Sequence, residues 1–149
     1  WFNASNVSVG TGQTLTIVGA TVANAGDYYI ITTINNCPST ASIVTTAIVD
    51  PIPNTAAFAG NDIGLCNTFT TNLDATAPSN GTGMWTTASG ATIANPNLAN
   101  TAVYNLPIGT STFYWTLSNG ACADFSVDSM VVDVTGASTD VANAGLNQN

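Results

Sequence analysis

Two residue types in this chain carry groups that could do chemistry, aspartate and cysteine. All eight acidic residues are Asp, three residues are Cys, and the chain has no Lys, Arg, His or Glu. Paired carboxylates could hydrolyse glycosidic bonds or bind calcium, and thiols could form disulfides. The missing residue types exclude His-dependent triads, Schiff-base lysines and arginine clamps on phosphate.

The spacing of the aspartates does not match a known catalytic or calcium-binding pattern. Asp124, Asp128 and Asp133 lie on or near one predicted strand, whereas Asp62 and Asp74 are far away in the sequence. No D-x-D-x-D-G loop is present. We therefore expect the aspartates to serve turns, strand edges and solubility, and we expect no enzyme activity and no cofactor. Calcium at a junction between modules is the alternative, with Asp50, Asp62 and Asp140 as its candidates.

The overall composition excludes further classes of function. The formal net charge is −8 with no basic residue, which argues against binding to nucleic acid or to an anionic membrane surface. No apolar run approaches the roughly 18 residues of a membrane-spanning helix. Apolar residues make up 45% of the chain, enough to bury cores of the size found in β-sandwiches.

Landmarks recur along the chain at nearly one spacing. The pairs are Trp1 and Trp85, 84 residues apart, then Cys37 and Cys122, 85 apart, and the Ala-Gly dipeptides at 59–60 and 144–145, also 85 apart. Three coincidences in the same order indicate tandem modules of about 85 residues. We expect the chain to be a piece of a longer array that begins inside one module and ends inside a third.

Short runs of β-branched and aromatic residues, separated by turn residues, predict an all-β fold without helices. The segment 51–55 contains two prolines and predicts a linker. The other predicted parts are the C-terminal part of a module (1–50), a complete module (56–138) and the start of a third (139–149). The predicted strands are 13–18, 28–34, 41–49, 63–65, 69–74, 83–87, 101–106, 111–118 and 125–134. About seven short strands in one module indicate a Greek-key immunoglobulin-like β-sandwich.

Several segments resemble a known class of repeat. Ala25-Gly26-Asp27-Tyr28 resembles the immunoglobulin-like A-G-x-Y motif that precedes the F strand, although Ile30 stands where antibody domains have Cys. The segments 59–62, 81–85, 95–97 and 113–122 are similar to PKD-like or immunoglobulin-like repeats of very large secreted proteins of Bacteroidota. Some of those proteins are gliding-motility adhesins exported by the type IX secretion route. The resemblance implies an extracellular or cell-surface location.

In that secreted setting the cysteines predict a covalent cross-link. Cys66 and Cys122 are the only cysteines of the second module, and the expected strand order brings both to one end, so we predict a disulfide between them. Two buried free thiols are the alternative. Cys37 corresponds to Cys122 at the 85-residue offset, and the position corresponding to Cys66 would precede Trp1. We therefore expect Cys37 to be unpaired within this chain.

Two further residue classes have alternative roles. Trp85 and Trp115 could stack on sugar rings, but they alternate in phase with other apolar residues, which favours the core. Tyr114 is expected on the opposite face, exposed to solvent. Asp128-Ser129-Met130 resembles the Bacteroidota O-glycosylation motif, so Ser129 is a candidate for modification, with an ordinary strand serine as the alternative.

These observations predict a structural segment of an extracellular or cell-surface adhesin or filament, a semi-rigid rod for extension, display or adhesion. The alternative is a spacer or carbohydrate-binding module attached to a secreted hydrolase. The expected partners are neighbouring modules of the same long chain, surface polysaccharide or other cell-surface proteins. The first module lacks the strands that would precede Trp1, so we expect an exposed apolar sheet edge unless upstream chain covers it.

Overall fold

The structure, a computed structural model, describes residues 1–53 and 55–138, and it divides into two compact units. Unit 1 is Trp1–Pro51, and unit 2 begins at Ile52. The boundary falls inside the predicted proline segment 51–55. The predicted third module at 139–149, which includes Asp140, lies outside the described residues.

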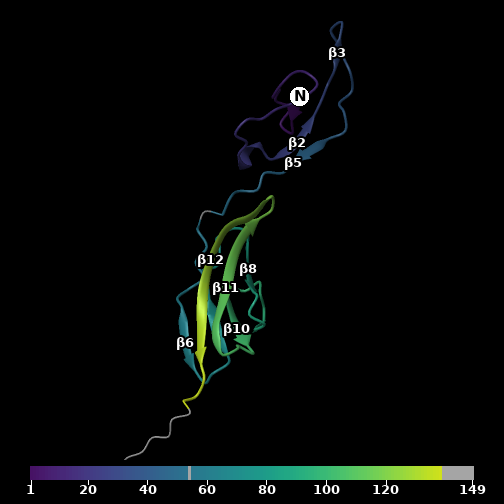
Figure 1. The fold of residues 1–149 in the computed structure, drawn as a ribbon. Coiled ribbons are helices and arrows are strands. Elements are labelled where there is room, and N and C mark those ends of the chain that lie inside the picture. The colour runs from purple at the N-terminus through teal and green to yellow at the C-terminus, as the bar shows by residue number, and fades with distance from the viewer. Residues whose placement is uncertain (54, 139–149) are drawn as a thin grey trace, which may run out of the picture. The chain divides into compact units, whose positions relative to one another are not determined.

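Unit 2 is a sandwich of two sheets. Its first sheet has the strand order β6-β12-β11-β8, and its second has the order β7-β10-β9 (Figure 1). The strands are β6 (Ile63–Cys66), β7 (Thr71–Asp74), β8 (Thr82–Thr87), β9 (Thr92–Ile93), β10 (Asn100–Tyr104), β11 (Gly109–Asn119) and β12 (Cys122–Thr135). The chain passes repeatedly between the sheets, so the predicted all-β Greek-key sandwich is confirmed.

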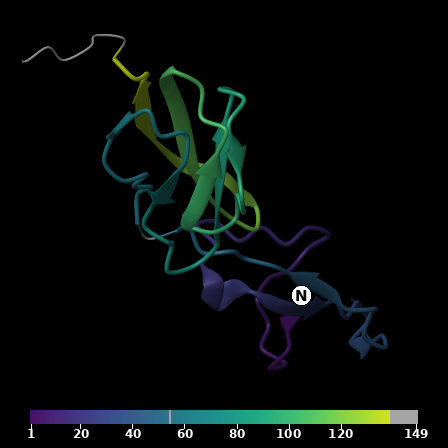
Figure 2. The ribbon, with the colours of Figure 1, turned by 90° about the horizontal axis from the view of Figure 1, so that it is seen from below.

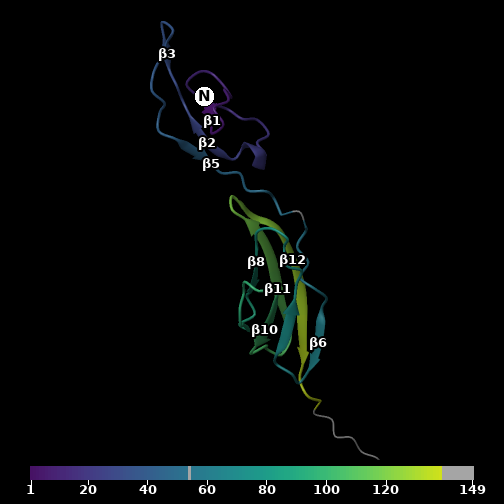
Figure 3. The same cartoon turned by 180° about the vertical axis from the view of Figure 1, so that it is seen from behind.

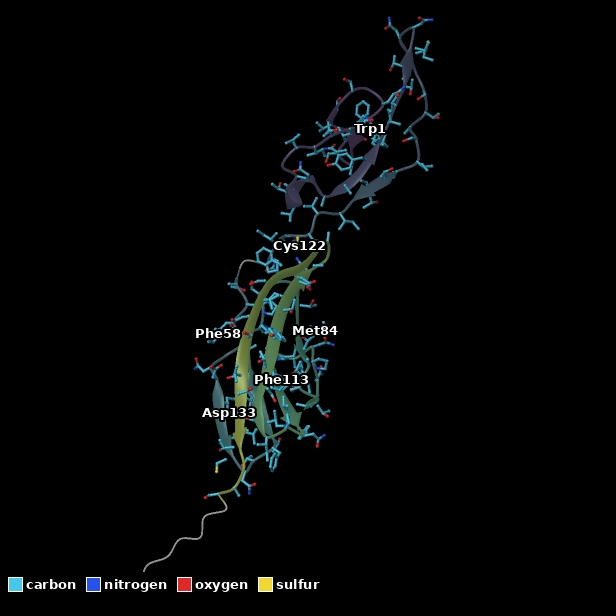
Figure 4. All side chains as sticks on the ribbon, viewed as in Figure 1. Trp1, Phe58, Met84, Phe113, Cys122 and Asp133 are labelled. Carbon is cyan, nitrogen blue, oxygen red and sulfur yellow. The ribbon has the colours of Figure 1, made fainter. Side chains whose placement is uncertain are left out.

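The core of unit 2 lies between the inward faces of these sheets. Alternate side chains of β11 point inward, as the period of two along a strand requires. The buried residues of the cluster are Ala59, Leu73, Ala75, Trp85, Val103, Leu106, Phe113, Trp115, Leu117, Met130, Val132 and Val134. Figure 4 shows Phe113 among the side chains that fill the inside of unit 2.

Strand β6 pairs in parallel with β12, unlike the other strand pairs of unit 2. Ile63 lies opposite Val132 and Cys66 lies opposite Thr135. The ends of β6 and β12 therefore come together at one end of the sandwich, and the β11–β12 hairpin closes the other end (Figures 1 and 3).

Unit 1 contains a three-stranded sheet with the order β1-β2-β5 and a separate hairpin of β3 and β4. Its elements are β1 (Phe2–Asn3), the 3-10 helix η1 (Val22–Asn24), β2 (Gly26–Tyr29), β3 (Thr33–Ile34), β4 (Cys37–Pro38) and β5 (Thr45–Ala47). The β3–β4 hairpin projects from the rest of unit 1 in all three ribbon views (Figures 1, 2 and 3). No helix among the described residues is long and apolar enough to cross a membrane.

One predicted strand of unit 1 is wrong. Residues 13–18 alternate in sequence, but the structure assigns no strand there. In unit 2 the corresponding strand, β10, is held by hydrogen bonds to β7. Residues 1–51 of the structure contain no strand in the place of β7, so the segment has no ladder to join.

Candidate functional site

The sheet of unit 1 repeats part of the sheet of unit 2, residue pair for residue pair. The strands β1, β2 and β5 pair in the same register as β8, β11 and β12. Phe2–Tyr29, Tyr28–Thr45 and Gly26–Ala47 of unit 1 match Thr86–Tyr114, Phe113–Met130 and Ser111–Val132 of unit 2. The offset is 84 residues in the first strand and 85 in the other two. The two sheets are therefore equivalent in register.

The hairpins that carry Cys37 and Cys122 are equivalent too. Each turn has two residues between its closing pair, which is Ile34–Cys37 in one hairpin and Asn119–Cys122 in the other. Asn35 and Asn36 have φ of 49° and 62°. Asn tolerates the left-handed region that tight hairpin turns require, which explains why the predicted turn forms there.

The inward face of the unit 1 sheet is open. Tyr28, at 9% exposure, is the one side chain classed as buried among residues 1–51, whereas the hydrophobic cluster lies wholly in unit 2. A concavity of about 390 Å³ lies over this face. It is lined by Trp1, Leu15, Ile17, Ala20, Asn24, Tyr28, Thr45, Ala47, Ile48 and Val49. This open apolar concavity is the candidate site of this chain.

Local structure explains how Tyr28 reaches this face. Helix η1 is held by Asn24, whose side-chain oxygen accepts hydrogen bonds from the backbone N–H and the hydroxyl of Thr21. The turn brings the Asn24 carbonyl to the Tyr28 hydroxyl, which donates a hydrogen bond of 2.7 Å. A tyrosine hydroxyl that donates to a backbone carbonyl a few residues upstream has the geometry of a tyrosine corner. The ring of Tyr28 thereby lies against the concavity.

In unit 2, residues 57–75 contribute to the core on the equivalent face, together with Val103 of β10. Leu73 and Ala59 of this segment are fully buried in the core. Strand β6 adds parallel hydrogen bonds along β12. The segment is also fixed by polar contacts, since the Asp128 carboxylate accepts a 2.8 Å bond from the backbone N–H of Ala59, and the Asp62 carboxylate accepts one from Val131.

The predicted disulfide between Cys66 and Cys122 is wrong. Because β6 is parallel to β12, Cys66 lies beside Thr135, at the end of β12 remote from Cys122. Thirteen residues of strand separate those ends, about 43 Å at 3.3 Å per residue, whereas a disulfide needs Cα atoms within about 7 Å. Figure 4 shows Cys122 at the hairpin end and Asp133 toward the other end of the strand. All three thiols are free, and Cys37 is exposed.

Four of the aspartates hold loops and strands in place through hydrogen bonds. Besides Asp62 and Asp128, Asp74 accepts a bond from the Asn100 amide at 3.1 Å, and Asp27 accepts one from the Thr46 hydroxyl at 2.6 Å. No group of three or more metal-ligating side chains of the types His, Cys, Asp and Glu occurs in the described residues.

The three aspartates named as calcium candidates are spread along the chain. Asp50 belongs to unit 1, Asp62 belongs to unit 2, and Asp140 lies outside the described residues. Asp62 already bonds the backbone of β12 through one carboxylate oxygen. Calcium binding at these positions stays a prediction.

The predicted core tryptophans are confirmed. The rings of Trp85 and Trp115 are buried with centroids 5.1 Å apart, and their indole N–H groups donate to the backbone carbonyls of Ala99 and Thr76. Tyr114 is exposed on the opposite face of the sheet, as predicted. Its partner across the strand pair is Ser129, also exposed. Glycosylation of Ser129 stays a prediction.

Comparisons with known proteins identify no family. No family model and no curated protein matches the chain. A solved PKD domain of the KIAA 1837 protein is similar at 23% identity and a TM-score of 0.49, covering 60% of this chain and 96% of that one. A PKD domain of human KIAA0319 is similar at 18% identity and a TM-score of 0.47, and the match covers 66% of this chain and 99% of that one. Domains 4 and 5 of the S-layer protein SbsC are similar at 14% identity and a TM-score of 0.40, and the match covers 74% of this chain and 58% of that one.

Proposed function

We propose that the chain is a structural segment of a tandem array of immunoglobulin-like or PKD-like modules, and that it has no catalytic role. One observation carries the proposal, the identical pairing register of β1-β2-β5 and β8-β11-β12 at an offset of 84 to 85 residues. Two unrelated domains would not share three strand registers. In this proposal unit 1 is the later part of one module and unit 2 is the next complete module.

The construction of unit 2 suits a load-bearing element. Its two longest strands, β11 and β12, run side by side for most of the sandwich and align ten pairs of residues in an antiparallel ladder. Pro51 and Pro53 lie on either side of the boundary between the units, and proline stiffens a linker. An array of such modules would form a semi-rigid rod that extends, displays or adheres.

The polar inventory supports a structural role. Asp27, Asp62, Asp74 and Asp128 each bond a neighbouring backbone or side-chain group. The chain offers trypsin no cleavage site because it contains no Lys or Arg, which suits an exposed fibre.

We place the array outside the cell or on its surface, as in the gliding-motility-type adhesins of Bacteroidota that the type IX route exports. The proposed partners are neighbouring modules, surface polysaccharide or other cell-surface proteins. Antibodies against residues 55–138 should label intact cells of the organism that makes the protein. Labelling only after the cells are permeabilised would contradict the proposal.

The second candidate is a spacer or carbohydrate-binding module of a secreted hydrolase. The exposed outer face of the first sheet favours it, because Tyr114 and Met84 are both close to half exposed there. Aromatic rings on a flat strand surface can stack on sugars. Binding of the full chain to a polysaccharide panel, lost in Tyr114→Ala and kept in Tyr104→Ala, would favour this candidate. Tyr104 is the matched control because it is equally exposed but lies on β10 of the other sheet.

A further inference from the structure

We propose that neighbouring modules of the array are joined by disulfides, each between the cysteine equivalent to Cys66 in one module and the hairpin cysteine equivalent to Cys122 in the next. This inference rests on the proposed function, because it requires modules that follow one another along the chain. It gives a role to two thiols that unit 2 cannot pair with each other.

The first argument is the position of the two thiols in unit 2. Cys122 begins β12, and Cys66 lies opposite Thr135, with which β12 ends. The thiols therefore lie at opposite ends of a strand of 14 residues, too far apart to bond within the module. Cys66 is exposed and Cys122 is partly exposed, so both can be reached from outside the module.

The second argument is that Cys122 lies where the chain enters unit 2. The carbonyl of Ile52, the first residue of the unit, accepts a hydrogen bond of 3.2 Å from the side-chain amide of Asn80. Gly81 follows Asn80 and lies so close to the β11–β12 hairpin that a Cβ atom would meet the Asn119 side chain at 2.9 Å. Asn119 and Cys122 are the closing pair of that hairpin. The entry point and the Cys122 thiol therefore share one end of the sandwich.

Cys66, in contrast, lies where β12 leaves unit 2. Besides the pairing of Cys66 with Thr135, the backbone N–H of Asn67 donates a hydrogen bond of 2.8 Å to the Thr135 carbonyl. The Thr135 hydroxyl donates one of 3.1 Å to the carbonyl of Leu65. The segment around Cys66 is thus fixed to the last residue of β12, from which the chain continues toward the next module.

A short junction brings these two kinds of end together in an array. At the 85-residue offset the position equivalent to Ile52 in the next module is Ala137, two residues after Thr135. Two residues of chain span at most about 7 Å. The exit end that carries Cys66 therefore adjoins the entry end of the next module, which carries the hairpin cysteine, whereas about 43 Å separates the two ends of β12.

The third argument is that the hairpin cysteine recurs. Cys37 closes the β3–β4 hairpin of unit 1 opposite Ile34, as Cys122 closes its hairpin opposite Asn119. Cys37 is exposed as well. A bond across every junction requires a hairpin thiol at the same place in successive modules, and the two units meet this requirement.

The bond forms by oxidation, for which a small-molecule disulfide such as oxidised glutathione supplies the oxidant. One protein thiolate attacks oxidised glutathione, which gives a mixed disulfide and releases one reduced glutathione. The second protein thiolate attacks the protein sulfur of the mixed disulfide, which forms the S–S bond and releases the other glutathione. Two protein thiols are oxidised, one glutathione disulfide is reduced, and the two protons end on the released glutathione thiols.

The test adds a third module in register. The extended chain is the full chain followed by residues 65–138, so that Asn149 precedes the added Leu65 as Gly64 precedes the original one. It holds five cysteines, three of the parent chain and two of the added copy. After equilibration with oxidised and reduced glutathione, the thiols are alkylated without reduction and the labels are counted by mass spectrometry. We expect three labels on the extended chain and also three on the parent chain.

Two variants of the extended chain form a matched pair, because the same substitution is made at the same place in two modules. Cys122→Ser in the added copy removes the proposed partner of Cys66, so all four remaining thiols should be labelled. Cys122→Ser in unit 2 removes a thiol that is free in the extended chain, so two of the remaining four should be labelled.

Folding of the added copy is checked by the near-ultraviolet circular dichroism of its own Trp85–Trp115 pair. A second chain, residues 1–138 followed by 54–138, repeats unit 2 in full and carries the same test if the first extended chain does not fold.

Three results would overturn the inference. They are five labels on the folded extended chain, equal label counts for the two Cys122→Ser variants, and a loss of labels that accompanies a covalent dimer on a non-reducing gel, which would place the bond between separate chains. None of them bears on surface labelling of cells by antibodies against residues 55–138, so the proposed function can stand or fall separately.

Discussion

Gly83→Ala should destabilise unit 2 although it adds only one methyl group. Gly83 lies on β8 opposite Leu117, and a Cβ atom at this position would overlap the indole ring of Trp115. That ring cannot move aside freely, because it packs against Trp85 at 5.1 Å and donates a 3.1 Å hydrogen bond to the Thr76 carbonyl. The methyl group must therefore displace a buried ring or the strand itself.

The expected cost is that of overpacking a close-packed core, about 1–3 kcal/mol in the free energy of unfolding. A change of 1 kcal/mol lowers the Tm of a domain of this size by about 4–8 °C, so a fall of about 5–20 °C is expected. Gly64→Ala is the matched control. Gly64 lies on β6 of the same sheet, it has no positive φ, and its Cβ would meet nothing within 4 Å.

The measurement is thermal and urea unfolding of the full chain, followed by the near-ultraviolet circular dichroism of the Trp85–Trp115 pair. Gly64→Ala should stay within about 0.5 kcal/mol of the parent chain, as exposed substitutions usually do. Equal stability of the two variants would refute the argument that Gly83 is required by the packing of Trp115.

Two further predictions concern the polar groups. Asp128→Ala should lower the free energy of unfolding by about 1–3 kcal/mol because it leaves the Ala59 N–H without its acceptor. Asp133→Ala, on the exposed side of the same strand, should lower it by less than about 0.5 kcal/mol, and equal urea midpoints for the two variants would contradict this. Alkylation of the unreduced chain should label Cys37, Cys66 and Cys122, since all three thiols are free; a labelled mass short by two thiols would show that a disulfide forms.

The sequence predicts best where local pattern and packing agree. Trp85 and Trp115 lie in phase with their apolar neighbours, and burying rings of that size leaves few other arrangements. The Asn35-Asn36 turn forms as expected because its chemistry is local. Such features need no knowledge of which strands become neighbours.

The failures arise where strand neighbours decide the outcome. The disulfide prediction assumed that Cys66 and Cys122 share an end, but the parallel pairing of β6 with β12 separates them. That pairing joins residues about 70 positions apart in the sequence, and no local sequence pattern predicts whether such strands pair in parallel or antiparallel. Residues 13–18 alternate between polar and apolar side chains, which is typical of a strand. A strand also needs a neighbouring strand with which to form hydrogen bonds, as β10 has in β7. The concavity of unit 1 likewise results from which strands are paired.

The central claim is that unit 1 is the later part of a module equivalent to unit 2, and that its inward face is open because no segment equivalent to residues 57–75 covers it in the described residues. A fusion tests it directly. A second copy of residues 55–84 is joined before Trp1 of the full chain, so that Met84 precedes Trp1 as it precedes Trp85. The matched control carries Leu73→Asp in the added copy alone, which places a charge where a buried leucine closes the core.

Hydrogen exchange of the amides of residues 45–49 is the decisive measurement. The account predicts that protection of these amides in the fusion rises to about that of residues 130–134, their equivalents in unit 2, and that the Leu73→Asp control abolishes the gain. Amides of 45–49 that exchange as fast in the fusion as in the parent chain, while β12 stays protected, would contradict the equivalence of the two units.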